Sequence, residues 1–284
     1  MKILDDAALR LGAAGIESPR LEARLLLGHA AGLSQTDIAG STITVSEPAR
    51  AHFETLLARR IALEPLAYIL GRREFWSLDF AVGPGVLIPR PETETLIESA
   101  LRQFPKRDSK LRVLDLGTGS GCLLLAFLSE RPKATGIGVD ISPAALAWAE
   151  RNADDLGLAA RARFVNDDWG RSLDSAFDVV FANPPYVRTG DIPNLAPDVS
   201  AHEPAIALDG GQDGLHSYRA IAAVVLPRLS SQGRLFLEIG QGQAEAVREV
   251  FGSKGFVTQG TVNDLARIDR CLMMVACAQH SRQT

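Results

Sequence analysis

The amino-acid sequence predicts an α/β protein with two domains: a small all-helical N-terminal domain and a doubly wound, mostly parallel α/β domain. Three observations support this. The chain has 284 residues, more than one average domain holds. Residues 1 to about 70 show only helical periodicity. From about residue 110, short apolar runs alternate with helical segments, which is typical of parallel strands joined by right-handed crossovers.

The helical domain is expected at residues 1–71. Three capping patterns predict where its helices begin: Ser18-Pro19, Ser34 with Asp37, and Ser46-Glu47-Pro48. Residues 72–83 then alternate apolar and polar side chains, which predicts a β-hairpin that links the two domains.

The α/β domain is expected at residues 84–284. Its predicted strands are Leu111–Leu116, Ala134–Val139, Ala162–Val165, Phe177–Ala182, Arg234–Ile239, Phe256–Val262 and Cys271–Ala276. Its predicted helices are Leu123–Leu128, Pro143–Leu156, Leu215–Leu229 and Ala244–Phe251. Because no helix separates the last two strands, they should form an antiparallel hairpin at one edge of the sheet.

Composition and charge argue against several classes of protein. No segment contains the roughly 18 uninterrupted apolar residues that a membrane span needs. Three cysteines are too few for a disulfide framework or a zinc site. The net charge of −4 and a near-neutral helical domain disfavour a nucleic-acid substrate. We therefore expect a cytoplasmic monomer that binds no membrane, no metal and no nucleic acid directly.

A glycine-rich loop, Gly117-Thr118-Gly119-Ser120-Gly121, follows the first strand of the α/β domain. Its G-x-G-x-G spacing differs from the dinucleotide pattern and favours a nucleoside cofactor without a pyrophosphate. A tight turn without a ligand is the alternative. Asp140 ends the second strand, where a carboxylate can accept hydrogen bonds from ribose hydroxyls or cap the next helix. Trp169, after the third strand, can stack on adenine.

The fourth strand ends in an NPPY motif, Asn183-Pro184-Pro185-Tyr186. An amide nitrogen is a poor nucleophile because its lone pair is delocalised. The Asn183 side-chain oxygen and the Pro184 carbonyl can accept hydrogen bonds from both N–H groups of this nitrogen and so orient its lone pair toward a methyl donor. The prolines fix this geometry in advance, and the Tyr186 ring can lie against the planar group. A plain rigid turn is the alternative. The residues alone therefore predict a planar nitrogen acceptor.

These motifs resemble those of the amino-methyltransferase superfamily. Three further segments are similar to the bacterial release factor-specific protein-(glutamine-N5) methyltransferases: Gly85–Glu94, Leu208–Leu215 with Tyr218-Arg219, and Asp264–Arg270. Arg267 departs from the family pattern, which commonly has glycine at that position. The departure concerns a turn at the sheet edge rather than the active site.

The resemblance implies a Rossmann-like class I methyltransferase domain that uses S-adenosyl-L-methionine and releases S-adenosyl-L-homocysteine. The implied substrate is the glutamine of the Gly-Gly-Gln motif in peptide chain release factors, which act in translation termination. The helical domain would recognise this substrate. A ribosomal-protein glutamine methyltransferase, a nucleic-acid amino (adenine N6) methyltransferase and an inactive cofactor-binding scaffold remain as alternatives.

The resemblance also implies the site residues. Cofactor contacts are expected at Gly117, Thr118, Gly119, Ser120, Gly121, Asp140, Trp169 and Asn183. Substrate contacts are expected at Asn183, Pro184, Pro185 and Tyr186, with Asn183, Pro184 and Tyr186 as the catalytic residues. Arg90 and Glu92 are expected near the mouth of the site.

Overall fold

The computed structural model describes residues 2–39 and 45–277. Its contacts divide the chain into two compact units. The helical unit contains the chain up to Arg72 together with Ala196–His202, and the α/β unit contains Arg73–Leu195 and the residues from Glu203 onward. None of the helices in the described part of the chain has the length and apolar character that crossing a bilayer requires.

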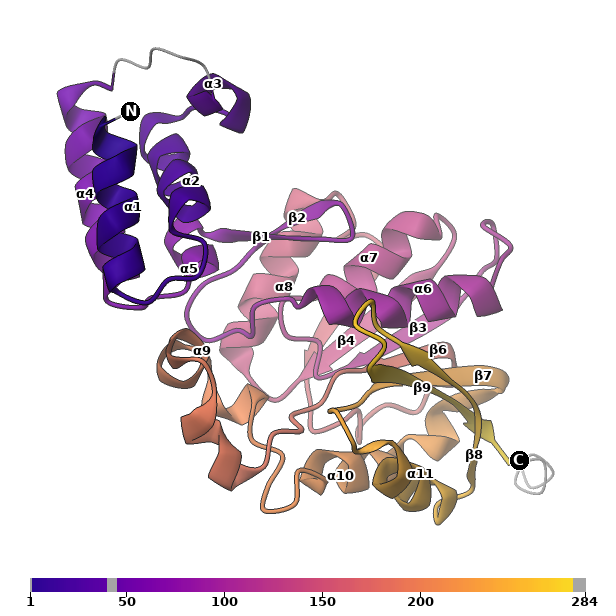
Figure 1. Ribbon diagram of the computed structural model, residues 1–284. Helices are drawn as coiled ribbons and strands as arrows, with labels where there is room; N and C mark the ends of the chain where they lie inside the picture. The colour runs from indigo at the N-terminus through magenta and orange to yellow at the C-terminus, as the bar shows by residue number, and fades with distance from the viewer. Residues whose placement is uncertain (1, 40–44, 278–284) are drawn as a thin grey trace. The chain divides into compact units, whose positions relative to one another are not determined.

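The helical unit is built around three antiparallel helices (Figure 1). Its elements are α1 (Lys2–Ala13), α2 (Pro19–Ala31), α3 (Gln35–Ala39), α4 (Glu47–Ile61), α5 (Leu66–Leu70) and, later in the chain, α9 (Pro197–His202). Helices α1, α2 and α4 bury Leu11, Leu27 and Phe53 in a core of their own. The buried Arg60 guanidinium lies 2.6 Å from Glu22 of α2 and 3.5 Å from Asp198 of α9, which links α9 to this unit.

The predicted starts of α2, α3 and α4 are confirmed, although only two use their expected caps. Ser34 accepts a hydrogen bond from the Asp37 N–H and donates its own N–H to that carboxylate. The Ser46 hydroxyl accepts from the Ala49 N–H at 3.4 Å. Ser18 precedes α2, but its side chain makes no capping bond; Pro19, with its fixed φ, begins the helix instead.

The predicted hairpin consists of β1 (Arg72–Phe75) and β2 (Leu78–Ala81). Trp76 and Ser77 form its turn with φ of 53° and 57°, the left-handed conformation that a two-residue hairpin turn requires. The Trp76 N–H donates to Glu94 at 2.8 Å, which helps to hold this unfavourable backbone in place.

A seven-stranded sheet forms the centre of the α/β unit. Its strands are β3 (Arg112–Leu116), β4 (Thr135–Asp140), β5 (Ala162–Asn166), β6 (Phe177–Ala182), β7 (Leu229–Glu238), β8 (Phe256–Asn263) and β9 (Asp269–Ala276). Their order is β5-β4-β3-β6-β7-β9-β8, in which the first five are parallel and β9 runs antiparallel to both neighbours. The predicted parallel sheet with an antiparallel hairpin at its edge is confirmed.

Helices cover both faces of this sheet (Figure 1). Because successive side chains in a strand point to opposite faces, Val113 packs toward α6 (Glu94–Gln103), α7 (Cys122–Glu130) and α8 (Pro143–Asp155), whereas Leu114 packs toward α10 (His216–Val224) and α11 (Ala244–Gly252). The connections also contain short 3₁₀ turns: η1 (Pro91–Thr93), η2 (Thr189–Asn194), η3 (Ala205–Ala207) and η4 (Leu226–Arg228).

Two local predictions differ from the structure. The helix expected over Leu215–Leu229 ends at Val224, and β7 already begins at Leu229. Pro227 explains this, since proline lacks an N–H and restricts the residue before it. Helix α6 was not predicted, although its Leu96, Ile97 and Ala100 are fully buried.

Candidate active site

The order in which strands are added to the sheet reverses at β3. The chain places β4 and β5 on one side of β3 and then crosses to place β6 on the other side. Ligands of open α/β sheets bind beyond the strand ends at such a point. A cavity of about 330 Å³ lies there. The predicted site residues that line it are Gly117, Thr118, Gly119, Ser120, Asp140, Trp169, Asn183 and Pro185.

The glycine loop between β3 and α7 is held open by backbone geometry. Gly117 and Gly119 have φ of 70° and 54°, which glycine adopts without strain. A Cβ on Gly117 would lie 3.3 Å from the Trp169 ring, so a side chain there would press on the wall of the cavity. Gly121 begins α7 outside the cavity lining, and a Cβ there would meet Leu125 at 3.1 Å. Gly121 also has φ of 80°, so its backbone conformation as well as the packing of α7 requires glycine.

Three polar residues in or beside this loop are buried: Asp115, Thr118 and Ser120. Asp115, in β3, is 1% exposed and accepts a hydrogen bond from the Thr118 hydroxyl at 2.7 Å. Burial raises the pKa of its carboxyl to about 7. Ser120 lines the cavity, and its buried hydroxyl contacts the Cys122 thiol but has no nitrogen or oxygen partner among the described residues. Buried hydroxyls are normally paired, so Ser120 has capacity for a ligand.

Asp140 ends β4 and faces the cavity. Its two carboxylate oxygens each accept one backbone N–H at 2.9 Å, from Gly119 and from Ser142. Burial is the main cause that raises its pKa. Ser142 itself caps α8 by accepting the Ala145 N–H, so Asp140 is not the helix cap. Each carboxylate oxygen retains a further lone pair that can accept a ligand hydroxyl.

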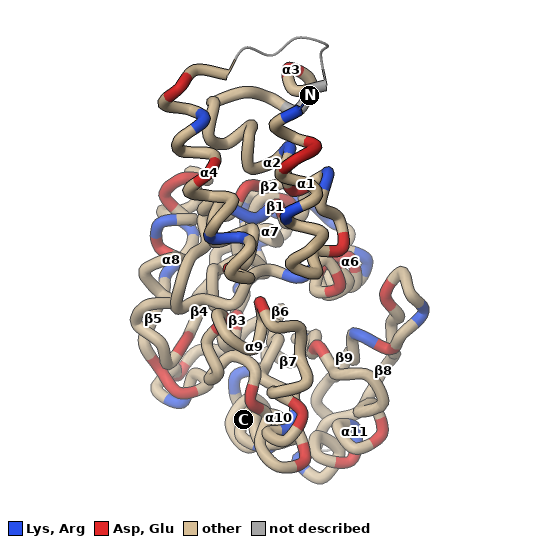
Figure 2. Tube along the Cα trace, turned by 60° about the vertical axis from the view of Figure 1, so that its left-hand side comes forward, with Lys and Arg blue, Asp and Glu red and all other residues tan. Residues whose placement is uncertain are grey.

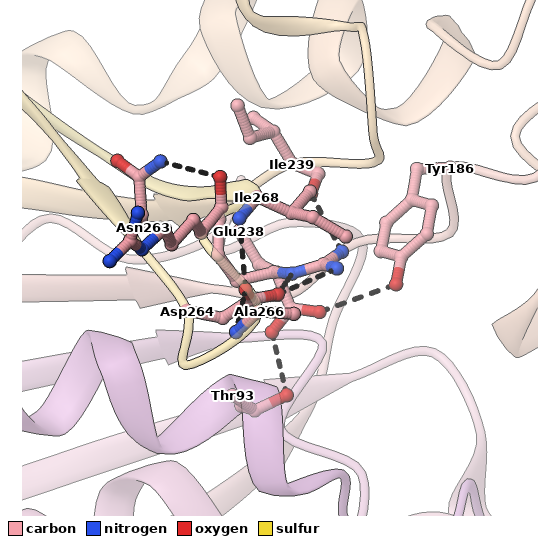
Figure 3. A network of polar contacts seen from close by, with 10 residues as sticks. Thr93, Tyr186, Glu238, Ile239, Asn263, Asp264, Ala266 and Ile268 are labelled. Atoms are coloured by element: carbon pink, nitrogen blue, oxygen red, sulfur yellow. Dashed lines mark hydrogen bonds and ion pairs between the residues drawn. The ribbon is translucent and has the colours of Figure 1, made fainter.

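The NPPY segment follows β6 and lies partly in the cavity wall. Asn183 and Pro185 line the cavity, whereas Pro184 is buried behind it and Tyr186 is not part of the lining. The Asn183 Nδ2 donates to the Thr93 hydroxyl at 3.1 Å. The Thr93 hydroxyl donates in turn to Glu238 Oε2 at 2.6 Å, and the Tyr186 hydroxyl donates to Oε1 at 3.3 Å (Figure 3).

The backbone after Tyr186 is fixed by a second loop, Leu208–Gly214. The Val187 N–H donates to the Leu208 carbonyl at 3.0 Å, and the Gly210 N–H donates back to the Val187 carbonyl at 2.7 Å. Gln243, just before α11, donates its side-chain amide to the Tyr186 carbonyl at 3.0 Å. These hydrogen bonds fix the backbone at the C-terminal end of the NPPY segment.

Arg90 and Glu92, expected near the mouth, have different positions. Arg90 lines the cavity and lies 2.5 Å from Glu203. That carboxylate is buried and also accepts the Ile88 N–H at 3.1 Å. Glu92 is exposed and does not line the cavity.

Sequence reasoning missed Thr93, Glu203, Glu238, Gln243 and the cavity-lining His216. Glu238 carried a signal, because an acidic residue that ends the apolar run Leu235–Leu237 beside β6 is unusual. Thr93 lies in the family-like segment Gly85–Glu94 but was given no role, and Glu203, Gln243 and His216 carried no signal of a part in the site. Among the described residues, no group of three or more His, Cys, Asp or Glu side chains is arranged to hold a metal ion.

Comparison with known proteins agrees with this geometry. Residues 2–71 match the family described as PrmC N-terminal domain, and residues 107–206 match a methyltransferase domain family. The structure has a TM-score of 0.51 to the Thermus thermophilus 16S rRNA N2 G1207 methyltransferase, at 20% identity over 72% of this chain and 49% of that chain. The fold and the cavity thus define a Rossmann-like class I methyltransferase.

The sequence relatives identify the family. The chain is 45% identical to the release factor glutamine methyltransferase of Rhodospirillum rubrum, over 96% of this chain and 83% of that protein. It is 43% identical to the enzyme of the same name from Caulobacter vibrioides, over 94% and 92% of the two chains. The chain belongs to the release factor glutamine methyltransferase family, which confirms the predicted resemblance.

Proposed function

We propose that the protein transfers a methyl group from S-adenosyl-L-methionine to the side-chain amide N5 of the glutamine in the Gly-Gly-Gln motif of peptide chain release factors. One observation carries the proposal: Asn183 of the NPPY segment and the glycine loop from Gly117 to Ser120 line the same cavity. Family membership supports the choice of a release factor glutamine as substrate.

The residues of the cavity fit the methyl donor. The glycine loop offers close backbone approach, the Ser120 hydroxyl has no nitrogen or oxygen partner among the described residues, and Asp140 retains lone pairs for ribose hydroxyls. Trp169 presents an aromatic surface for adenine. When bound, the cofactor supplies a sulfonium methyl group with a good leaving group, and S-adenosyl-L-homocysteine is the product.

The NPPY segment orients the accepting amide. The Asn183 side-chain oxygen and the Pro184 carbonyl accept hydrogen bonds from the two N–H groups of the substrate nitrogen. This arrangement points the nitrogen lone pair toward the methyl group. Asn183, Pro184 and Tyr186 are the catalytic residues of this proposal, and Pro185 adds to the substrate contact. No strong base is required, because the nitrogen becomes more acidic as it is alkylated.

We further propose that residues 1–71 recognise the release factor, that residues 72–83 link this domain to the catalytic domain at residues 84–284, and that the enzyme works as a cytoplasmic monomer without a metal ion. Acidic and basic residues alternate along α1, α2 and α4 (Figure 2), which supports a protein rather than a nucleic-acid partner. A ribosomal protein and a nucleic-acid base are the competing substrates.

A methyl-transfer assay decides among these substrates. Purified release factor, ribosomal proteins, ribosomal RNA and DNA are each incubated with the enzyme and labelled S-adenosyl-L-methionine. We expect one added methyl group on the release factor glutamine, located by mass spectrometry. Label that appears only in ribosomal protein or nucleic acid would refute the proposal.

Two substitutions separate the proposed roles. Asn183→Ala should lower kcat by about 100-fold or more, since one preorganised polar contact to the reacting group is lost, and should leave cofactor affinity nearly unchanged. Asp140→Ala should instead weaken cofactor binding by about 1.5–3 kcal/mol, which is typical of hydrogen bonds to a charged group. Calorimetry measures the affinity and steady-state kinetics measure kcat. Reversed phenotypes would show that the assignments are wrong.

A further inference from the structure

We propose that Thr93, held by Glu238, is a positioning residue that fixes which end of the Asn183 amide faces the substrate. The inference rests on the proposed function, because it assumes that the Asn183 oxygen accepts a hydrogen bond from the substrate nitrogen. Thr93 itself acts through Asn183. The argument uses the direction of two hydrogen bonds that join segments far apart in the sequence.

The Thr93 hydroxyl has a single hydrogen, which it donates to Glu238 Oε2 at 2.6 Å. An ionised carboxylate only accepts, so the direction of this bond is fixed. Toward Asn183, the same hydroxyl oxygen can therefore only accept, and it accepts Nδ2 at 3.1 Å. The side-chain oxygen of Asn183 must then point away from Thr93.

The position of Thr93 supports a dedicated role. Thr93 ends η1 with a helical backbone conformation and directly precedes α6, so its hydroxyl is not placed to cap that helix. This hydroxyl makes no capping bond and turns to Glu238 instead. Thr93 lines the cavity but is only 2% exposed, and Glu238, behind it, is 1% exposed, so little water reaches the bond between them.

Glu238 is anchored from several sides (Figure 3). Its Oε1 accepts the Tyr186 hydroxyl at 3.3 Å. The nearby Arg270 guanidinium, whose charge lowers the pKa of Glu238, donates to the Ile239 carbonyl at 3.2 Å and pairs with Asp264 at 3.1 Å. The C-terminal segment Asp264–Arg270 thus supports the carboxylate behind Asn183, and it does so without lining the cavity.

Protonation of Glu238 would remove the directional constraint. Burial, with a smaller contribution from the charge of Glu92, raises its pKa to about 7 against the opposing effects of Thr93, Arg270 and Tyr186. The titratable and charged groups whose electrostatics couple to Glu238 are Glu92, Cys122, Tyr186, Tyr218, Arg270 and Cys271. A protonated Glu238 carboxyl can donate to the Thr93 hydroxyl, which is then free to donate to Asn183. The Asn183 amide can then flip, so that its oxygen and nitrogen exchange positions. Activity should therefore fall as pH decreases through this pKa.

Four variants of the full-length enzyme test the inference. Thr93→Val removes the hydroxyl at nearly constant shape, Thr93→Ser keeps it, and Glu238→Gln removes the charge. Thr95→Val places valine two residues along, also at a buried position, and serves as the control. The measurements are kcat between about pH 5.5 and 8.5, cofactor affinity, the melting temperature, and the pH titration of the Asn183 side-chain NH₂ resonances.

We expect Thr93→Val and Glu238→Gln to lower kcat at least about tenfold at pH 8 with unchanged cofactor affinity, as loss of one oriented hydrogen bond implies. Wild type, Thr93→Ser and Thr95→Val should keep high kcat and lose it below about pH 7, with a matching shift of the Asn183 resonances. Thr93→Val and Glu238→Gln should lack both transitions.

The inference is wrong if Thr93→Val retains the kcat of wild type, if Thr93→Ser loses as much as Thr93→Val, or if the wild-type Asn183 resonances do not titrate near neutral pH. Should Thr93→Val fail to fold, the comparison of wild type with Glu238→Gln still decides. The resonance titration needs no substrate. It therefore tests the positioning role even if the release factor proves not to be methylated, which would refute the proposed function alone.

Discussion

At the residue scale, Asp115 and Glu238 share one property. Each carboxyl is 1% exposed, and burial raises the pKa of each to about 7. Because the charged form of a buried acid is disfavoured, the native protein holds these protons more tightly than the unfolded chain does. The native protein therefore loses stability as pH rises from the ordinary pKa of a carboxyl group to about 7, because over this range only the unfolded chain ionises these groups readily.

The substitution Asp115→Asn should reveal this cost. The stability that Asp115 contributes is fully present below its unfolded pKa of 3.8 and is lost as pH rises through the folded pKa of about 7. The stability of Asp115→Asn relative to wild type should therefore increase between about pH 4 and 7 and stay constant above that range. Denaturant unfolding of the cofactor-free proteins measures it, with the exposed Asp154→Asn as the control. A difference that does not change with pH would contradict the prediction.

The sequence predicted the site residues that carry local signals. It did not predict those whose part in the site depends on contacts with distant segments. Gly117–Gly121, Asp140 and Asn183 stand at strand ends, where spacing and residue type indicate a ligand site. Thr93 bonds to residues 90 and 145 positions away. No periodicity or motif links such positions, because the packing of α6 against β7 brings them together.

At the element scale, the loop Leu208–Gly214 supports the NPPY segment by close backbone approach. A Cβ on Gly210 would lie 2.8 Å from the Tyr186 Cα and 2.9 Å from its carbonyl carbon. Gly210 has no positive φ, so its constraint is space rather than backbone conformation. Gly210 of this family-like loop thus has a physical role in the shape of the site.

Gly210→Ala should displace the NPPY segment. We expect a loss of about 1–3 kcal/mol in the free energy of unfolding, the range for overpacking, together with a lower kcat. Gly190→Ala is the matched control, since a Cβ there meets nothing within 4 Å and its φ is not positive. Thermal melts and methyl-transfer kinetics compare the two variants. Equal stability and activity in both would contradict the role given to Gly210.

Elements with clear periodicity were predicted well, and those that depend on tertiary context were not. β6 matches its expected range residue for residue, and the capped starts of α3 and α4 were correct. Helix α10 was predicted too long because the apolar pattern continues past Val224 into β7. Helix α6 was missed because it follows the Pro89–Thr93 segment without a strong cap.

At the scale of the whole molecule, the helical and α/β units have separate hydrophobic cores. Leu11, Leu27 and Phe53 belong to the first, whereas Val113 and Leu114 belong to the two cores that flank the sheet. All residues that line the proposed cofactor cavity belong to the α/β unit. Cofactor binding should therefore stabilise that unit selectively.

Hydrogen exchange measures this selectivity. At a cofactor concentration of about 100 times Kd, protection of the α/β unit should rise by up to about 2.7 kcal/mol. The gain should appear in Gly117–Cys122 and Asn183–Tyr186, while α1, α2 and α4 keep their exchange rates. An equal gain in α1, α2 and α4 would show that the two units unfold as one, contrary to this prediction.

The assignment of α9 to the helical unit has a consequence for modular exchange between related enzymes. The chain passes between the units at three points, after Arg72, after Leu195 and after His202. A chimera that swaps only the first 72 residues would separate Arg60 from Asp198, its ion-pair partner on α9. If the helical domain recognises the partner, as proposed, a recombinant enzyme with new partner specificity must inherit two pieces of sequence together, and the second begins ten residues after Tyr186.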